Sequence, residues 1–306
     1  MSLADAERPR LLSGDLPSLH RAAAVTSLEG QRRYLRGLRG ILAGAVVAAI
    51  AGALAAASDE LRGAAYVSGT SFVATIGITA YLAVLRPERA WYDGRAAAES
   101  AKSLAWEYAV GGGPFCHSTC TNADALLTER LHEIVTKLRD FSIGAKDDRG
   151  EQITPAMRHL RGASLPERRA VYVRDRLENQ RSWYANKSLW NRTRYRRWLS
   201  VSIAAQVVGV VTAFLVAAGT VRFDASGILA VLAAAIAAWV QAKDHSGIAQ
   251  AYGIAAQELA LARARVESEE AAQEATFAAL IDDAEQAISR EHTLWLARRG
   301  SVLNAG

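Results

Sequence analysis

Long apolar blocks that carry no charge alternate with charged stretches along the chain. The four blocks contain no Asp, Glu, Lys, Arg or His, and they are Ile41–Ala57, Gly63–Leu85, Leu199–Val221 and Ala225–Ala242. A helix needs about 20 apolar residues to cross a hydrocarbon core of about 30 Å. A buried helix of a soluble protein rarely runs so far without a polar face. The pattern therefore predicts four transmembrane helices.

Short turns, Ser58–Arg62 and Arg222–Asp224, join the blocks into two hairpins. Basic residues flank both hairpins: Arg32, Arg33, Arg36, Arg39, Arg86, Arg89 and Arg95 around the first, and Arg192, Arg194, Arg196, Arg197 and Lys243 around the second. Basic residues favour the cytoplasmic side, so we expect both termini and all long segments to be cytoplasmic. Met1–Thr26 is polar and has no signal-peptide core. We expect a multi-pass protein of the cell inner membrane.

The net charge of +5 also fits a nucleic-acid partner, because excess arginine attracts phosphate. The arginines gather at the ends of the apolar blocks, however, where each is worth about 1 kcal/mol near an anionic leaflet. We therefore expect the lipid bilayer, and no nucleic acid, as a partner.

The charged stretches contain elements at matching positions in the two halves. Three pairs of identical residues are separated by the same number of positions along the chain. They are Arg33 and Arg192, Gly94 and Gly253, and Glu99 and Glu258. The pattern predicts the same order of elements in each half: a basic helix, a membrane hairpin, and a helix that leads back to the cytosol. Both hairpins enter from the same side, so the pattern indicates a parallel repeat.

The stretch WYDGRAAAESAKSLAWEY follows the first hairpin and places five residues on one helix face. They are Trp91, Arg95, Glu99, Lys102 and Trp106, at spacings of four, four, three and four. We expect the first tryptophan at the membrane interface and the three charges on a solvated face. Trp106 needs a surface to pack against, and the helix that carries Trp183, Tyr184 and Trp190 is the candidate.

The segment between the halves contains its own helix signals. GGGPF at Gly111–Phe115 ends the preceding helix, and Asn122 or Asp124 can cap the next one. Ile143–Gly162 predicts a loop. Ser164, Pro166 and Glu167 form a capping box that opens a helix running into the third span.

A heptad-like seam follows the fourth block. Its apolar members are Ile248, Tyr252, Ala255, Leu259, Ala262, Val266, Phe277, Ile281, Ala284, Ile288 and Trp295. The seam predicts coiled-coil packing, within the chain or between subunits, with a break or hairpin at SEEAAQEA. We expect an all-α membrane protein, in which two transmembrane helical hairpins continue into long cytosolic helices that form a bundle.

These elements divide the chain into four predicted regions. Residues 1–30 form an N-terminal cytosolic segment and 31–115 the first hairpin with its cytosolic helix. Residues 116–190 form a cytosolic helical region, and 191–306 form the second hairpin with a long C-terminal cytosolic helix.

Motifs for catalysis and metal binding are missing from the sequence. It has no G-x-S-x-G, P-loop or H-E-x-x-H pattern, so we expect no enzyme, no catalytic residues and no cofactor. Cys116 and Cys120 flank His117, but no second pair of ligands accompanies them, so we expect no metal and two reduced thiols. A secondary transporter would place an ionisable residue at midplane, and the blocks contain none.

Small residues repeat every four positions down two of the spans. The first ridge is Gly40, Gly44, Ala48, Gly52 and Ala56, and the second is Gly227, Ala230, Ala234 and Ala237. Such ridges let helices approach closely, within one unit or between subunits. Hydroxyls along the second span can line a wet path or bond to their own helix. Four helices close into a packed bundle, so a pore would need a homo-oligomer.

Two motifs resemble the bacterial SLATT family, the SMODS- and SLOG-associating two-transmembrane effectors. The motifs are WYDGRAAAESAKSLAWEY with GGGPF, and YVRDRLENQRSWYANKSLWN. The matching residues are Trp91, Arg95, Glu99, Lys102, Trp106, Pro114, Phe115, Tyr172, Gln180, Trp183, Tyr184 and Asn191. The resemblance spans roughly residues 30–300, with the hairpin present twice. It implies a pore-forming effector of bacterial conflict systems, triggered through a nucleotide-signalling partner protein. The alternative is a membrane-tethered adaptor whose cytosolic helices recruit a partner without conduction.

Overall fold

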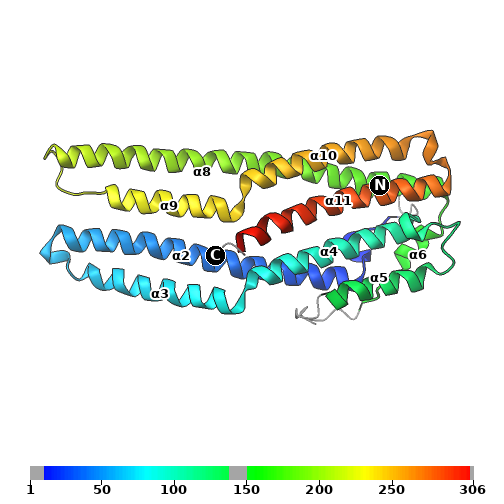
Figure 1. The fold of residues 1–306 in the computed structure, drawn as a ribbon, viewed down its shortest axis with the longest axis horizontal. Helices are drawn as coiled ribbons and strands as arrows, with labels where there is room; N and C mark the ends of the chain where they lie inside the picture. Colours follow the sequence, from blue (N-terminus) through cyan, green and yellow to red (C-terminus); the bar gives the residue numbers. More distant parts are fainter. Residues whose placement is uncertain (1–9, 138–149, 304–306) are drawn as a thin grey trace, which may run out of the picture. The chain divides into compact units, whose positions relative to one another are not determined.

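The computed structural model describes residues 10–137 and 150–303, and within these ranges it is helical with no strand (Figure 1). The long helices are α2 (Ser18–Ala57), α3 (Ala64–Leu85), α4 (Pro87–Val110), α8 (Asn179–Ala217), α9 (Ser226–Lys243), α10 (His245–Glu267) and α11 (Glu274–Leu303). Shorter helices are α5 (Ala123–Lys137), α6 (Pro155–Arg161), α7 (Leu165–Val171) and a π-helical segment, η4 (Tyr172–Glu178). Short 3₁₀ turns lie at Ser13–Asp15, Asp59–Leu61, Gly113–Phe115 and Glu269–Ala272. The all-α fold expected from the sequence is confirmed.

The chain divides into two compact units whose segments alternate along the sequence. One comprises Met1–Glu29, Arg89–Ser188 and Gln250–Gly306, and we call it the charged unit. The other comprises Gly30–Glu88 and Leu189–Ala249, and we call it the apolar unit. Each unit takes segments from both halves of the chain.

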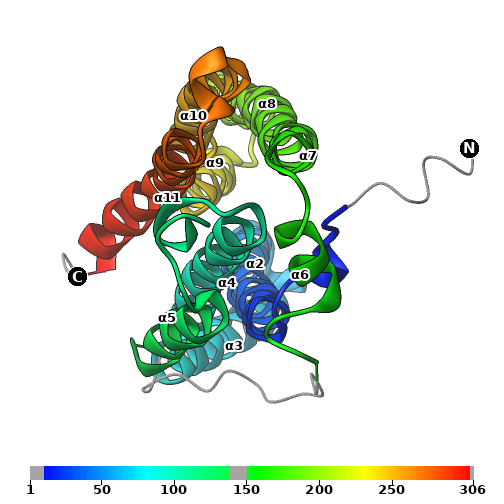
Figure 2. The ribbon, with the colours of Figure 1, turned by 90° about the vertical axis from the view of Figure 1, so that its right-hand side faces the viewer.

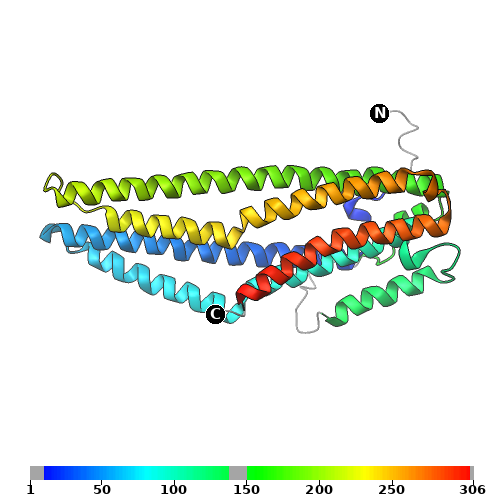
Figure 3. The same cartoon turned by 45° about the horizontal axis from the view of Figure 1, so that its top comes forward.

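The apolar unit is built from the two predicted hairpins, α2 with α3 and α8 with α9. Four helices in the described part of the chain are long and apolar enough to cross a membrane, and they carry the four predicted blocks. Helices α2 and α9 lie side by side in Figures 1 and 3, and the Arg39 guanidinium lies 5.1 Å from the centre of the Trp239 ring. The prediction of four transmembrane helices is confirmed at the level of length and composition.

The first glycine ridge faces the partner helix of its own hairpin. A Cβ atom at Gly44 would lie 2.5 Å from Cγ2 of Thr75, and one at Gly40 would lie 2.9 Å from Cδ1 of Ile78. Gly52 is looser, because its Cβ would lie 3.7 Å from Oγ of Ser68. A Cβ atom at Gly227 of the second ridge would have no described atom of another helix within 4 Å. Of the two packing alternatives, the first ridge therefore serves packing within the chain.

The hydroxyls of α3 mostly bond to their own helix. Thr70, Thr75 and Thr79 each donate to a carbonyl three or four residues earlier, at 2.8–3.1 Å. Ser68 is different, because its hydroxyl donates across the hairpin to the carbonyl of Ala48 at 3.0 Å. The threonines therefore follow the second of the two readings, in which the helix satisfies its own hydroxyls.

The second span of each hairpin ends at a residue with left-handed backbone. Arg86 has φ 42° and ends α3, and Asp244 has φ 48° and ends α9. They are the only non-glycine residues with positive φ in the described part of the chain. Such a residue turns the chain out of its helix, and L side chains rarely adopt it. The two halves therefore share the same break between span and returning helix.

In the charged unit, α4 packs closely on the first turns of α2 (Figure 2). A Cβ atom at Gly94 would lie 2.9 Å from the backbone nitrogen of Ser27 and 3.0 Å from the carbonyl oxygen of Ala23. The Ser27 hydroxyl donates to the carbonyl of Trp91 at 2.9 Å. The repeated glycine of the sequence thus permits backbone contact between two helices.

The segment that follows α4 agrees with most of its local signals. Helix α4 ends at Val110, and Gly111 and Gly113 take φ values of 77° and 49°. The Asn122 side chain caps α5 by accepting from the nitrogen of Ala125 at 3.1 Å. The predicted loop at Ile143–Gly162 is wrong for α6, which begins where Thr154 caps Met157 and proline occupies the first turn. The earlier part of that loop lies outside the described residues.

The capping box at Ser164 and Glu167 is present, and the helix it opens runs without a gap from Leu165 to Ala217. The C-terminal seam folds back within the chain, because a 3₁₀ turn at Glu269–Ala272 separates α10 from α11. Its buried members are Tyr252, Ala255, Leu259, Val266, Phe277, Ile281, Ala284 and Ile288. The predicted break is confirmed, and the seam packs inside the chain.

Candidate functional site

The interior of the charged unit contains a fully buried ion pair. Arg176 lies in the π-helix and Glu285 in α11, and both side chains are 1% exposed. The Arg176 Nε and Nη2 atoms donate to the two carboxylate oxygens of Glu285 at 2.9 and 2.5 Å. π-helical segments are rare and occur often at functional sites, because they place one side chain out of the ordinary helical register.

Two hydroxyls complete the network around this pair. Tyr172, also in the π-helix, donates to Oε1 of Glu285 at 2.9 Å. Nη2 of Arg176 also donates to the Ser103 hydroxyl of α4 at 3.3 Å. The remaining nitrogen, Nη1, is buried and has no hydrogen-bond partner. The network therefore joins α4, the π-helix and α11 and leaves one charged donor unsatisfied.

Trp106 packs against the helix that carries this network. Its ring meets that of Tyr172 edge to face, with 6.0 Å between the centroids, and Trp106 is 3% exposed. Trp183 and Tyr184 lie further along the same continuous helix and contact each other and Tyr252 at 5.2–5.3 Å. The structure thus buries Trp106 against the predicted helix, at Tyr172.

A cavity of about 530 Å³ lies beside the network. Seven of the residues singled out in the sequence line it: Arg95, Glu99, Lys102, Trp106, Gln180, Trp183 and Tyr184. Arg176 and Asp175 of the π-helix, His20 of α2 and Ile288 of α11 also contribute to its wall. The two sequence motifs therefore meet at one cavity, although some 80 residues separate them in the chain.

Two expectations for α4 are wrong. The charges of Arg95, Glu99 and Lys102 face the cavity and are only partly exposed, so they do not form a solvated face. Trp91 is 5% exposed and lies 4.9 Å from the Tyr92 ring, so protein rather than lipid headgroups surrounds it. Both differences arise because a second helix layer covers this face of α4.

Burial changes the acidity of two groups on α4. Burial, together with the nearby Arg176 guanidinium, lowers the pKa of Lys102 even though Glu99 acts in the opposite direction. Burial and the neighbouring carboxylates of Glu285 and Asp282 raise the pKa of Glu107 to about 8. The Glu107 carboxyl therefore carries its proton at neutral pH. At Lys102, burial disfavours the charged form of the amine.

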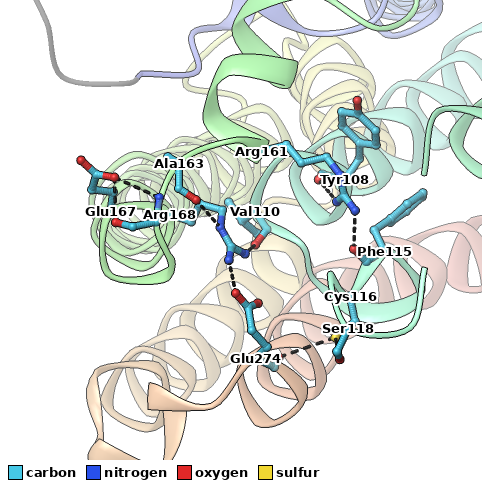
Figure 4. Close-up of polar contacts among 11 residues, drawn as sticks. Tyr108, Val110, Phe115, Cys116, Ser118, Arg161, Ala163, Glu167, Arg168 and Glu274 are labelled. Carbon is cyan, nitrogen blue, oxygen red and sulfur yellow. Dashed lines mark hydrogen bonds and ion pairs between the residues drawn. The ribbon is translucent and has the colours of Figure 1, made fainter. Parts of the chain in front are cut away.

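Two arginines hold the glycine-rich loop that ends α4 (Figure 4). Arg161 donates to the carbonyls of Tyr108 and Phe115 at 2.8 and 3.0 Å. Arg168 is 2% exposed, and it donates to the carbonyls of Val110 and Ala163 and to the Glu274 carboxylate. The carbonyls freed at the helix end thus receive guanidinium donors.

Glycine is required at Gly111 and Gly112 of this loop. A Cβ atom at Gly111 would lie 2.7 Å from Nη1 of Arg168, and one at Gly112 would lie 2.2 Å from Cγ2 of Ile281. Another residue would be strained at Gly111, whose φ is 77°, and at Gly112 it would collide with Ile281 of α11.

The two cysteines are both free. Cys116 is buried, with its sulfur 3.1 Å from the Ser118 hydroxyl, and Cys120 is partly exposed. Among the described residues, no group of three or more His, Cys, Asp or Glu side chains is placed to hold a metal ion.

Several residues of the site were not recognised in the sequence. Arg176, Glu285 and Glu107 lie at positions where helix periodicity predicts burial, but a charged residue there reads as an interruption of the pattern. The available signal was the burial of neighbouring positions: Tyr172 and Leu177 flank Arg176, and Ala284 and Ile288 flank Glu285. Periodicity alone cannot pair two charges that are 109 residues apart.

Comparison with known proteins places both halves in one family. A model of the SMODS and SLOG-associating 2TM effector domain 3 matches residues 17–169, and one of domain 1 matches residues 172–295. The two matches meet where the π-helix begins. No curated protein and no solved structure matches the chain. The chain belongs to the SLATT family, the SMODS and SLOG-associating 2TM effector domains, and carries the domain twice.

Proposed function

We propose that this protein is an oligomeric pore-forming effector of the bacterial inner membrane, and that its charged unit controls the pore. The observation that carries the proposal is the continuity of α2 and of α8. Helix α2 begins with cavity-lining His20, and α8 with cavity-lining Gln180 and Trp183, and each continues unbroken through an apolar span. In each case the cavity-lining residues and an apolar span therefore belong to one continuous helix, through which a change at the cavity can reach the span.

The apolar unit supports assembly in several copies. At most 11% of the apolar window of each span is buried within the chain, and α3 has none of its window buried. Lipid or neighbouring copies must cover the rest. Four helices pack into a closed bundle without a channel, so an aqueous path requires several chains around it.

The family assignment supports an effector role in bacterial conflict systems. In this proposal the chain is not an enzyme and binds no nucleic acid. A nucleotide-signalling partner protein delivers the trigger to the charged unit, which lies in the cytosol as a helical bundle.

A membrane-tethered adaptor is the second candidate. One observation favours it: Thr70, Thr75 and Thr79 of α3 bond to their own helix, so they are not committed to a polar lining. In this alternative the charged unit recruits a partner and no ions flow.

Ion flux separates the two candidates. The purified chain is reconstituted in liposomes. Dye or ion release is then recorded with and without the proteins that the neighbouring genes encode. Release with discrete conductance steps supports the pore. Intact liposomes under every triggering condition that produces partner recruitment would support the adaptor.

Trp106→Ala tests control by the charged unit. Truncation of a buried aromatic side chain removes about 3–5 kcal/mol of packing, so triggered leakage should be lost while membrane insertion, measured by fractionation, is retained. The matched control is Trp190→Ala, because Trp190 lies on the apolar unit and is 47% exposed. Undiminished leakage from the inserted Trp106→Ala variant would contradict control by the charged unit.

The proposed orientation places both termini and the charged unit in the cytosol. It rests on the arginines that flank both hairpins and on the short turns between the spans. A cysteine introduced at Ser58 or Asp224 should react with an impermeant reagent in intact cells. Cys120, which is partly exposed, should react only after lysis, and its labelling in intact cells would overturn the orientation.

A further inference from the structure

The cavity of the charged unit has the size of a small-molecule site. Its volume of about 530 Å³ lies within the range of roughly 300–1,000 Å³ that is typical of ligand pockets. Segments from α2, α4, the π-helix, α8 and α11 converge on it, so a bound molecule would contact helices from both halves of the chain.

The charges at its wall favour an anion. Arg176 is already paired with Glu285, which leaves two cations, Arg95 and Lys102, facing two carboxylates, Glu99 and Asp175. Arg174 already binds the Asp175 carboxylate at 2.6 and 2.7 Å, so that carboxylate offers little to the cavity.

One cation at the wall keeps an unused hydrogen-bond donor. Arg176 keeps a buried Nη1 without a hydrogen-bond partner. The Lys102 side chain lies at the cavity wall, where burial lowers its pKa even with Glu99 nearby. A partly buried cation is costly unless a charge or an acceptor compensates it. An anion placed between these side chains would supply both.

The aromatic wall favours a planar ring. Trp106, Trp183 and Tyr184 all line the cavity. Trp183 belongs to the charged unit and keeps 41% of its surface exposed. Trp faces bind planar rings by stacking, and they do so with little regard to ring substituents.

We propose that the cavity binds a small anionic ligand with a planar ring, of the size and chemistry of a mononucleotide, with Lys102 and Arg176 at its anionic group and Trp183 at its ring. A second ligand class, a bare anion such as phosphate, would use the cations alone. The inference concerns binding only and stands whether or not the spans conduct.

Calorimetric titration of the purified full-length chain in detergent tests it. The probes are AMP, ADP, adenosine and inorganic phosphate. AMP or ADP should bind with a Kd of about 1 mM or tighter, and adenosine and phosphate should each bind more weakly than the molecule that joins them. If neither nucleotide binds at five times the expected Kd, the proposal is overturned. If phosphate and AMP bind equally well, the claim that the cavity binds a planar ring is overturned.

Two variants assign the contacts. Lys102→Gln should weaken AMP binding about tenfold, because a hydrogen bond to a charged group contributes that much. Arg130→Gln is the control, since it also removes one positive charge but on an exposed residue of α5 that does not line the cavity. Trp183→Leu changes a partly exposed residue and should weaken AMP while leaving phosphate unchanged. Equal AMP binding by Lys102→Gln and Arg130→Gln, or by Trp183→Leu and wild type, contradicts the assignment.

Discussion

The two units place their apolar and charged side chains in opposite ways. In the apolar unit, Phe72 and Phe214 are 57% and 73% exposed, whereas in the charged unit Arg176 and Glu285 are 1% exposed. The apolar unit has the surface expected in a hydrocarbon solvent, where helices gain little from burying more apolar surface. It relies instead on close backbone approach, as at Gly44. The interior of the charged unit combines aromatic packing with a buried ion pair.

The comparison teaches that the two units respond to different substitutions. A charge removed from the interior of the charged unit leaves its partner unsatisfied, and bulk added to the glycine ridge of the apolar unit separates two helices. Each change should leave the other unit intact.

The largest effect is expected at the buried ion pair. Arg176→Met leaves the Glu285 carboxylate buried without its partner, which should lower the free energy of unfolding of the charged unit by about 3–5 kcal/mol. Thermal unfolding followed by tryptophan fluorescence measures this, and fractionation should show unchanged membrane insertion.

The double variant Arg176→Met with Glu285→Leu is the control for this effect. It removes both charges and should recover most of the loss, because replacing a whole buried pair by apolar residues is often neutral. A single variant as stable as wild type would mean that the pair does not hold the interior together.

An intermediate effect is expected at the glycine ridge. Gly44→Leu places bulk where a Cβ atom would already lie 2.5 Å from Thr75, and such overpacking costs about 1–3 kcal/mol. The variant should lower the detergent resistance of the first hairpin while the fluorescence melt of the charged unit stays unchanged.

Gly77→Leu is the matched control on the facing helix, because a Cβ atom there would have no described atom of another helix within 4 Å. It should leave the hairpin unaffected. If Gly77→Leu reduces the size of the detergent-extracted particle while Gly44→Leu does not, the contact between copies lies on the outer face of α3 and the ridge carries less of the packing than proposed.

The smallest effect concerns pH. The pKa of Glu107 is raised from 4.5 to about 8 in the folded chain. The folded state therefore holds a proton that the unfolded state has lost between these values, so the stability of the charged unit should fall as pH rises from about 5 to 8. Glu107→Gln keeps a neutral side chain at every pH and should flatten this dependence.

At pH 8 the Glu107→Gln variant should melt above wild type by at least about 2–4 °C, the shift that 1 kcal/mol produces in a chain of this size. The two proteins should melt alike at pH 5. A variant with the same slope as wild type would assign the pH dependence to another group.

Much of the fold follows from local signals in the sequence. The four spans follow from charge-free length, the hairpins from short turns, and the start of α7 from Ser164 and Glu167. These signals involve residues within a few positions of one another, so they act before any tertiary contact forms.

The sequence predicts only part of the candidate site. The face of α4 was predicted as one surface, and the motif around Trp183 as another, but neither pattern specifies which helix covers Glu99 or Lys102. The pairing of Arg176 with Glu285 depends on how α11 folds back along α10, and a periodic pattern does not set that register. The assignment of Trp91 to the membrane interface failed for the same reason, because the first turns of α2 bury it.

The alternation of the two units along the chain has a consequence for biosynthesis. Glu285 follows Arg176 by 109 residues, which at 5–20 residues per second takes roughly 5–20 s to translate. Both hairpins have left the ribosome before the final segment of the charged unit is complete. The ion pair at its centre can therefore close only after both hairpins are available for membrane insertion, so a chain truncated before α11 would insert its spans while Arg176 still lacked its carboxylate.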